Sequence, residues 1–308
     1  MPSSDRKIIM RDSTLREGLD TPTVSFTMEQ KKEITELLDN AGVAEIEAVA
    51  PGYFLRDIEF VKTILDKGLR SKTTGLIYSH GDICREEIDE GARYLDRFDL
   101  LMPVSPKRKP YDRDEKIRIL LEALEYSLDK HPEVGVGFPH STQVETGFLS
   151  EIGQKAVEKG AKRVTVYDTN GSRDPFEIHS LITGLREGLS CPLFFHGHND
   201  LGMATANSLS AIIAGADGLD LTINGLGDRA GNGSLEQIVM CLHLKGYKTG
   251  VSLDELIPLS KSIEKMSGIA VSKLAPVTGE FIFVHKSPAH LEIPELFMAF
   301  DPRSINLE

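Results

Sequence analysis

The chain has 308 residues, of which 40% are hydrophobic and 27% are charged, as in an ordinary globular protein rather than a disordered or fibrous one. Its net charge of −12 argues against a nucleic-acid partner, which would require a basic surface. The length allows one large domain or two small ones.

Short apolar runs recur along the chain and predict eight strands, at residues 7–11, 44–49, 73–77, 98–104, 135–138, 163–167, 193–195 and 218–223. The segments between them carry apolar residues at the three- and four-residue spacing of helices, as at 28–40, 115–130, 149–159 and 204–214. Strand followed by helix, eight times over, predicts a closed parallel (β/α)8 barrel. An open doubly wound sheet would alternate in the same way, but the GxGxxG loop that it usually carries after its first strand is absent.

The texture of the sequence changes after the eighth unit, which we expect to finish near Lys245. One helical stretch, 253–266, precedes an irregular tail that contains several prolines. We therefore expect a barrel domain at residues 1–250 and a C-terminal arm at residues 251–308, which would serve as a lid or as a dimerisation element.

Cysteine usage and the N-terminus give no sign of export. Cys84, Cys191 and Cys241 lie far apart without a CxxC spacing, so neither a disulfide framework nor a zinc knuckle is indicated. No apolar signal region is present, and no segment approaches the roughly 18 apolar residues of a membrane span. We expect a cytoplasmic protein without a membrane partner. Its one basic cluster, residues 107–109, is either a solvated loop or a site for an anionic substrate tail such as a nucleotide phosphate.

Polar residues gather where the predicted strands end, and in a parallel barrel these ends converge on one mouth. The sharpest signal is the pair His196 and His198, because residues two apart on a strand point the same way and can present two imidazoles to one ion. Such a pair alone is more often structural. Asp12, at the end of the first strand, would supply a third ligand and leave positions open for substrate and water.

Three further residues belong with this candidate metal site. Arg11 would place a guanidinium where it could stabilise a developing enolate oxygen, or it could pair with a carboxylate for structure alone. Glu47 could orient Arg11 or form a first-turn salt bridge. The glycine-rich segment 225–233 suits a mobile loop, from which Asn232 could reach the metal through its side-chain oxygen.

Three motifs closely resemble the DRE-TIM metallolyase superfamily, and within it the Claisen-condensing isopropylmalate, homocitrate and citramalate synthases. They are RDSTLREG at 11–18, HGHNDLGMATANSL at 196–209 and NGLGDRAGN at 224–232. The resemblance implies that Asp12, His196, His198 and Asn232 bind a divalent metal ion, that Arg11 and Glu47 are catalytic, and that Thr169 binds an oxo acid. Mg²⁺, Mn²⁺ and Zn²⁺ all suit a mixed nitrogen and oxygen site, and two imidazoles favour Mn²⁺ or Zn²⁺.

The tail segment HKSPAH at 285–290 is similar to the family's HxSGIH element, with Pro288 and Ala289 in place of glycine and isoleucine. The element implies His290 as a base that assists proton removal from acetyl-CoA, often across a dimer interface. The reaction implied is a condensation of acetyl-CoA, or a related acyl-CoA, with a small 2-oxo acid to give a 2-hydroxy-2-alkyl dicarboxylate, in a homodimer.

The chain departs from the synthase pattern at three points. Asp20 stands where the family usually has glutamine, and the loop 139–145 lacks an acidic pair and an arginine. The chain is also too short for the regulatory domain of isopropylmalate synthases, so we expect no feedback control. The oxo acid itself would be selected near the mouth by Leu76, Tyr78, His80, Phe138, His140, Ser141 and Asn224.

Two other classes of function remain open at this point. A carbon–carbon lyase of the hydroxymethylglutaryl-CoA lyase or aldolase type would use the same barrel, although that lyase branch has a cysteine in its glycine-rich loop and segment 225–233 has none. A barrel that has lost its activity and serves as a scaffold is the third class, and the intact set of ligands argues against it.

Overall fold

The computed structural model describes residues 6–79, 84–109 and 111–307. Its strands are β1 (Ile9–Asp12), β2 (Glu45–Val49), β3 (Lys72–Tyr78), β4 (Arg97–Leu101), β5 (Val134–Phe138), β6 (Val164–Asp168), β7 (Leu193–Gly197) and β8 (Gly218–Leu221). The helices that follow them are α1 (Met28–Ala41), α2 (Phe54–Lys62), α3 (Arg85–Tyr94), α4 (Arg113–Leu128), α5 (Thr146–Lys159), α6 (Pro175–Arg186), α7 (Ala204–Ala214) and α8 (Leu235–Leu244).

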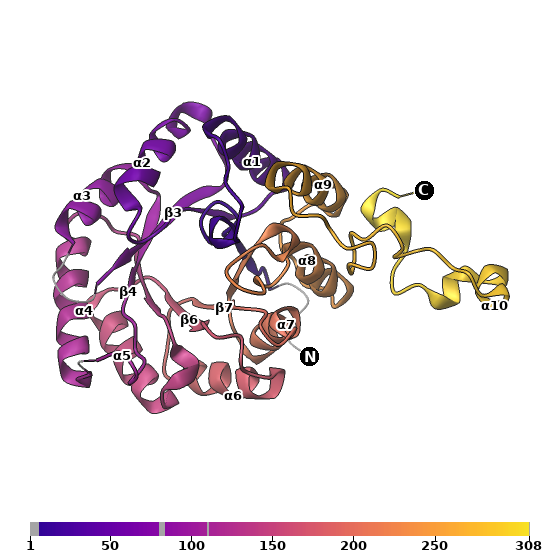
Figure 1. The fold of residues 1–308 in the computed structure, drawn as a ribbon. Helices are drawn as coiled ribbons and strands as arrows, with labels where there is room; N and C mark the ends of the chain where they lie inside the picture. Colours follow the sequence, from indigo (N-terminus) through magenta and orange to yellow (C-terminus); the bar gives the residue numbers. More distant parts are fainter. Residues whose placement is uncertain (1–5, 80–83, 110, 308) are drawn as a thin grey trace.

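The strands are all parallel and close into a barrel in the order β1 to β8, with β8 paired back onto β1. Figure 1 shows the helices as a ring around this barrel. The predicted (β/α)8 barrel is therefore confirmed, and the open doubly wound sheet is excluded. The fourth strand ends at Leu101 rather than at Val104, because Pro103 has no backbone N–H to continue the ladder.

The main hydrophobic core lies between the sheet and the ring of helices. Helix α1 illustrates how the sequence builds it: Thr27 and Gln30 form a capping box at its start, Ile34 and Leu38 are fully buried, and Gly42 ends it with a φ of 87°. That left-handed conformation is one that glycine adopts at little cost. The helix therefore begins, packs and ends where its sequence directs.

The interior of the barrel carries charges where barrels of this type usually carry branched apolar residues. Arg11 donates to both carboxylate oxygens of Asp220 and to Asp99, each at 2.7 Å. Arg163 bonds to the other oxygen of Asp99 at 3.0 Å and to Glu45 at 2.6 Å. These five buried residues, which we call the ionic layer, join strands β1, β2, β4 and β8 and the residue just before β6, below the mouth.

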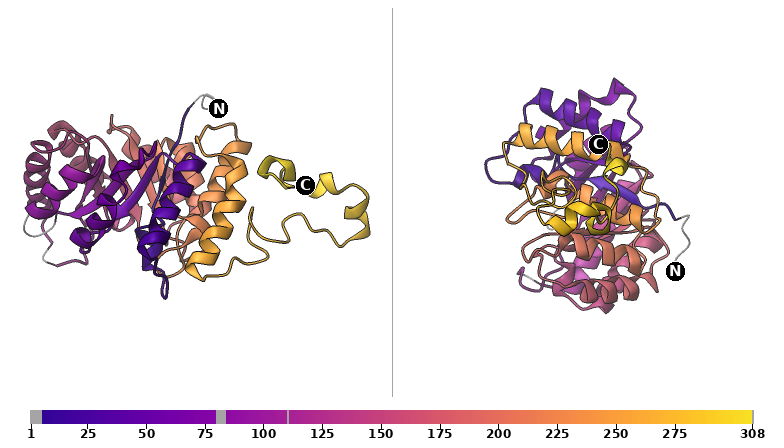
Figure 2. Two further views of the ribbon diagram at one scale, coloured as in Figure 1. Left: turned by 90° about the horizontal axis from the view of Figure 1, so that it is seen from above. Right: turned by 90° about the vertical axis from the view of Figure 1, so that its right-hand side faces the viewer.

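The C-terminal part of the chain leaves the barrel. Helix α9 (Leu256–Ser267) packs beside α1, and the chain then runs outward to the short helix α10 (Pro288–Glu292) before turning back toward its end. Figure 2 shows this segment standing apart from the ring of helices. None of the helices in the described ranges has the length and apolar character needed to cross a bilayer.

Candidate metal centre

The end of β1 separates two neighbouring residues that the sequence assigned to one site. Arg11 points into the barrel, where it meets the ionic layer, and Asp12 points to the opposite face, as successive strand residues do. The Asp12 carboxylate accepts hydrogen bonds from the backbone N–H and the hydroxyl of Thr14, at 2.9 and 3.0 Å. Burial raises the pKa of Asp12 to about 7. The structure thus gives Asp12 a local partner on the loop rather than a place beside the histidines.

Glu17 takes the position that the sequence analysis gave to Asp12. It begins a 3-10 turn (Glu17–Asp20) that carries the chain over the mouth after β1. Its carboxylate lies 3.7 Å from His198 Nε2, and the Nε2 atoms of His196 and His198 lie 3.3 Å apart. One ligand atom from each of the three residues falls within 4.8 Å of the others, and all three residues are buried. We call Glu17, His196 and His198 the metal cluster.

The spacing and charge of the metal cluster fit a divalent ion. Two nitrogens each bound at about 2.0–2.1 Å, at octahedral or tetrahedral angles, stand about 2.8–3.4 Å apart. Burial lowers the pKa of His198 to about 3, which keeps its ring neutral. Burial alone would raise the pKa of Glu17, but the neighbouring Arg16 and the two histidines lower it to about 2. Glu17 and His198 are therefore in the deprotonated forms that bind metal.

Buried polar atoms without partners gather around the metal cluster. Within the described part of the chain, Nδ1 of His196, Nδ1 of His198 and both polar side-chain atoms of Asn232 have no hydrogen-bond partner. A Cβ added at Gly227 would lie 3.3 Å from Asn232 Cγ and 3.4 Å from Glu17 Cγ, so a side chain there would press on both residues. Native structures rarely leave buried polar groups unpaired. An ion beside Asn232 would supply the missing partner.

Arg16 and Glu47 form an ion pair next to the metal cluster. Arg16 Nε donates to Glu47 Oε2 at 2.6 Å, and its Nη1 donates to Glu17. Ser13 also donates to Glu47, at 2.9 Å. Arg11, by contrast, lies 3.8 Å from Glu47 and makes no hydrogen bond with it. The guanidinium nearest the candidate metal site is therefore that of Arg16, and Glu47 orients it.

Asp220 links the metal cluster to the ionic layer. Its Oδ2 lies 3.3 Å from His196 Nδ1, and both of its oxygens accept from Arg11. The three residues are neighbours across β1, β8 and β7, since Arg11 pairs with Asp220 and Asp220 pairs with His196 in the sheet register. The contact is an ion-pair distance and not a hydrogen bond, since His196 Nδ1 has no hydrogen-bond partner among the described residues. A carboxylate this close to Nδ1 favours the tautomer with its proton on Nδ1, which leaves Nε2 free for a metal.

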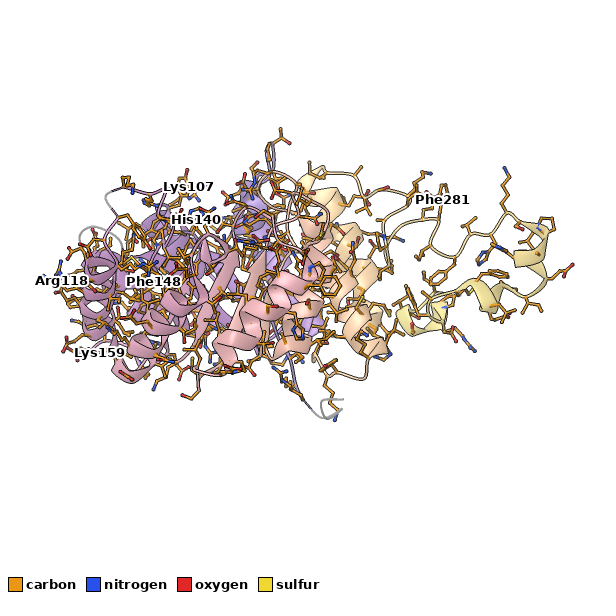
Figure 3. The ribbon with its side chains drawn as sticks, turned by 90° about the horizontal axis from the view of Figure 1, so that it is seen from below. Lys107, Arg118, His140, Phe148, Lys159 and Phe281 are labelled. Atoms are coloured by element: carbon orange, nitrogen blue, oxygen red, sulfur yellow. The ribbon has the colours of Figure 1, made fainter. Side chains whose placement is uncertain are left out.

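The loops after β5 to β8 are tied together around the mouth. The backbone N–H of His140, at a φ of 66°, donates to Thr169 Oγ1 at 2.8 Å. Arg229 makes two bonds to Asp200, at 2.7 and 2.9 Å, and a third to the carbonyl of Thr169. Figure 3 places His140 and Lys107 along the same edge of the barrel, opposite Lys159 at the end of α5. Thr169 and His140 lie at the mouth, where they bond to each other and Thr169 also accepts from Arg229. Their role in substrate binding stays a prediction.

The remaining predicted substrate residues have other surroundings. Phe138 is fully buried in the main core, and Ser141 donates to the carbonyl of Phe138. The Asn224 side chain exchanges two hydrogen bonds with Ser260 of α9. Tyr78 is 38% exposed at the end of β3, and His80 lies outside the described residues.

His290 is far from the metal cluster of its own chain. It belongs to α10 at the outer end of the arm, where its ring stacks on Phe297 with 3.7 Å between centroids. Figure 1 shows α10 well away from the mouth of the barrel. As a base it would have to act on another chain or after a large movement of the arm.

The sequence analysis missed Arg16, Glu17 and Asp220, although the first two stand inside its own first motif. The signal that could have found Arg16 and Glu17 is the position at which β1 ends. The strand ends at Asp12, and the five residues that follow, up to Glu17, can cross the mouth of the barrel. Asp12, by contrast, is the last residue of the strand itself, and its side chain bonds locally to Thr14.

Comparison with known proteins agrees with the motifs. A family model described as HMGL-like matches residues 7–263. A probable 2-isopropylmalate synthase of Methanopyrus kandleri is 37% identical over 91% of this chain and 56% of its own length. A putative (R)-citramalate synthase of Archaeoglobus fulgidus is 35% identical over 91% of this chain and 58% of its own, and a homocitrate synthase of Methanopyrus kandleri is 34% identical over 98% and 77%.

The chain thus spans little more than half the length of several curated relatives. Among solved structures, the HMG-CoA lyase of Brucella melitensis superposes with a TM-score of 0.73 at 18% identity, covering 85% of this chain and 99% of the lyase. That likeness bears on the fold alone. The matching family model and the synthase relatives carry the assignment: the chain belongs to the HMGL-like family.

Proposed function

We propose that the protein catalyses a metal-dependent Claisen-type condensation of acetyl-CoA, or a related acyl-CoA, with a small 2-oxo acid. The observation that carries the proposal is the metal cluster with the Arg16–Glu47 pair at its side. The synthase names of relatives at 34–37% identity support the same reaction class.

Glu17, His196 and His198 would hold the ion, with the Asn232 amide as a further oxygen donor. Bound there, Mn²⁺, Mg²⁺ or Zn²⁺ supplies Lewis-acid polarisation of the ketone of the oxo acid. Asp220 holds the His196 ring with Nε2 toward the site. Glu47 holds Arg16, whose fixed positive charge favours the negative charge that develops on substrate oxygen during carbon–carbon bond formation.

The reaction also needs a base, a proton for the ketone oxygen and a water molecule. A base removes a proton from the methyl group of the thioester, the resulting carbon attacks the ketone carbon, and the ketone oxygen takes up a proton to become the tertiary hydroxyl. Water then cleaves the thioester and releases coenzyme A. The exposed basic segment 107–109 lies on the mouth side of the barrel, where it suits the phosphates of the coenzyme.

The base is His290 of a second copy, in our proposal. The arm exposes apolar side chains that a lone chain does not cover, among them Leu274 at 80%, Leu296 at 73% and Val284 at 63%. Exposed apolar surface of this kind marks an interface. We propose that residues 251–308 form a dimerisation arm and bring His290 to the mouth of the partner barrel.

The reaction is tested by thiol release from acetyl-CoA with Mn²⁺, Mg²⁺ or Zn²⁺ and a panel of glyoxylate, pyruvate, 2-oxoisovalerate, oxaloacetate and 2-oxoglutarate. We expect thiol release with at least one oxo acid, and none after metal chelation or in Glu17→Gln. Silence across the panel together with cleavage of a 3-hydroxy acyl thioester would overturn the condensation in favour of a lyase.

Mixing two inactive variants tests the role of the arm. If His290 acts across the interface, a mixture of Glu17→Gln and His290→Ala chains contains heterodimers in which one site has both an intact metal cluster and an intact histidine. Random exchange would then restore about a quarter of wild-type activity. A monomeric mass in light scattering, or no recovery on mixing, would contradict the shared site.

A further inference from the structure

The ring of Tyr167 lies beside the metal cluster, near the C-terminal end of β6. Tyr167 is on β6 and pairs with His196 of β7 in the sheet register, and the two rings are 4.8 Å apart between centroids. Tyr167, Leu76 and Leu101 form a small apolar cluster of their own, separate from the main core. They are only 5%, 1% and 4% exposed. We call these three residues the floor.

Gly137 of β5 makes room for the ring. A Cβ built at Gly137 would lie 2.6 Å from Leu101 Cδ2, 3.0 Å from Tyr167 Cε2 and 3.2 Å from the Tyr167 hydroxyl oxygen. Even an alanine at position 137 would therefore collide with the floor. The phenol of Tyr167 thus reaches from β6 over β5 toward Leu101, and fills the space that a side chain on β5 would otherwise occupy.

Packing rather than hydrogen bonding holds this ring in place. The Tyr167 hydroxyl is buried and has no hydrogen-bond partner among the residues that the structure describes. Burial raises the pKa of Tyr167 far above its usual value, so the phenol stays neutral. A buried hydroxyl without a partner lowers stability rather than adding to it, so the structural contribution of Tyr167 lies in the bulk of its ring.

The direction open to a bound oxo acid leads over the floor. A 2-oxo acid that binds an ion through its carboxylate and ketone oxygens directs its side chain away from that ion. The β1 and β2 side of the mouth is occupied by the Arg16–Glu47 pair, and the β8 side by the loop that carries Asn232. The remaining direction, toward β3, β4 and β5, is the one that Tyr167 covers.

We propose that Tyr167 is a specificity-determining residue whose ring limits the depth of the acceptor pocket, so that the substrate is a 2-oxo acid with a short side chain, such as glyoxylate or pyruvate. This inference rests on the proposed function for the identity of the acceptor. In this proposal the aromatic ring of Tyr167 selects the oxo acid by size, and the hydroxyl of Tyr167 takes no part in the selection.

The experiment compares Tyr167→Ala and Tyr167→Leu with Tyr167→Phe. For each chain we measure kcat/KM with glyoxylate, pyruvate, 2-oxobutyrate and 2-oxoisovalerate, and metal-dependent binding of the same acids by titration calorimetry. One methylene in an apolar pocket changes kcat/KM by roughly 10- to 200-fold. We expect both shortened variants to raise the ratio for 2-oxoisovalerate over pyruvate by at least about 10-fold, whereas Tyr167→Phe keeps the wild-type order of acids.

The calorimetric readout separates this inference from the proposed reaction. If no thiol is released but the shortened variants bind longer acids with the expected shift, the reaction fails and the size limit stands. If thiol is released but the order of acids is the same in all chains, Tyr167 is not the size limit. A wild-type protein that binds 2-oxoisovalerate more tightly than pyruvate also overturns the inference. Tyr167→Leu, which can still pack on Leu76 and Leu101, decides the matter if Tyr167→Ala does not fold.

Discussion

The two sides of the barrel mouth are built on opposite principles. On the side of β1, β7 and β8, His198 and Asn232 keep buried polar atoms that no other described group satisfies. On the side of β3 to β6, the floor residues pack their apolar atoms on one another, and the Tyr167 hydroxyl, which is also unpaired among the described residues, is the one polar atom in their side chains. Unpaired polar atoms call for a ligand, and closed apolar packing sets a limit on its shape. Chemistry and selection are therefore assigned to different strands, and the predictions below test that division.

The largest effect is expected at Glu17. Glu17→Gln removes one anionic donor from the metal cluster, so metal affinity should fall by more than the roughly 100-fold that follows loss of an outer partner. Metal content after dialysis, measured by mass spectrometry, checks this. Asp12→Asn is the matched control, since Asp12 faces Thr14. If Asp12→Asn loses the metal and Glu17→Gln keeps it, Asp12 is the ligand, as assigned from the sequence, and Glu17 is not.

The next largest effect is expected at Asp220, which contacts His196 from inside the barrel. Asp220→Asn keeps the shape of the side chain but weakens its hold on His196 Nδ1 and on Arg11. We expect metal affinity to drop by about 10- to 100-fold, with kcat largely recovered at saturating metal. A competition titration with a chromogenic chelator measures the affinity. Equal losses of kcat at every metal concentration would show that Asp220 does more than position His196.

A smaller effect is expected where the two sides are joined. Arg229 ties the β8 loop to Asp200 and to the carbonyl of Thr169, but it is 40% exposed and so its bonds compete with water. Arg229→Ala should weaken substrate binding by about 0.5–1 kcal/mol, or two- to fivefold in KM. Steady-state kinetics with varied oxo acid would check this. A change in metal content instead would place Arg229 on the metal side.

The last effect concerns stability rather than binding, and it tests Asp12 at the edge of the metal side. Burial raises the pKa of Asp12 to about 7, above its unfolded value of 3.8, so the folded chain binds more protons than the unfolded chain between these pH values. Wild-type stability should therefore fall as pH rises from about 4 to about 7. Asp12→Asn removes that loss, and its melting temperature relative to wild type should be higher at pH 8 than at pH 5. A pH-independent difference would show that Asp12 is not a buried, uncompensated carboxyl.

The sequence predicted the fold because the pattern of strand followed by helix occurs eight times, and each repeat independently indicates the same architecture. It also located His196 and His198, since two residues on one strand need only the period of the strand to be placed together. Glu17 depends on the path of a turn, and Asp220 on the register between β8 and its neighbours. Tyr167 depends on the absence of a side chain at Gly137. These are relations between distant segments, which no local pattern records.

The ionic layer also bears on how this chain can change. Arg11, Arg163, Asp99 and Asp220 are shared, so that each charge serves at least two partners. Removing one member of a buried pair leaves its partner uncompensated and costs about 3–5 kcal/mol, whereas exchanging a whole pair for well-packed apolar residues is often neutral. Substitutions in the ionic layer are therefore coupled. We expect a mutant library that changes one of these residues at a time to yield unstable proteins, and a library that changes paired residues together to yield folded barrels.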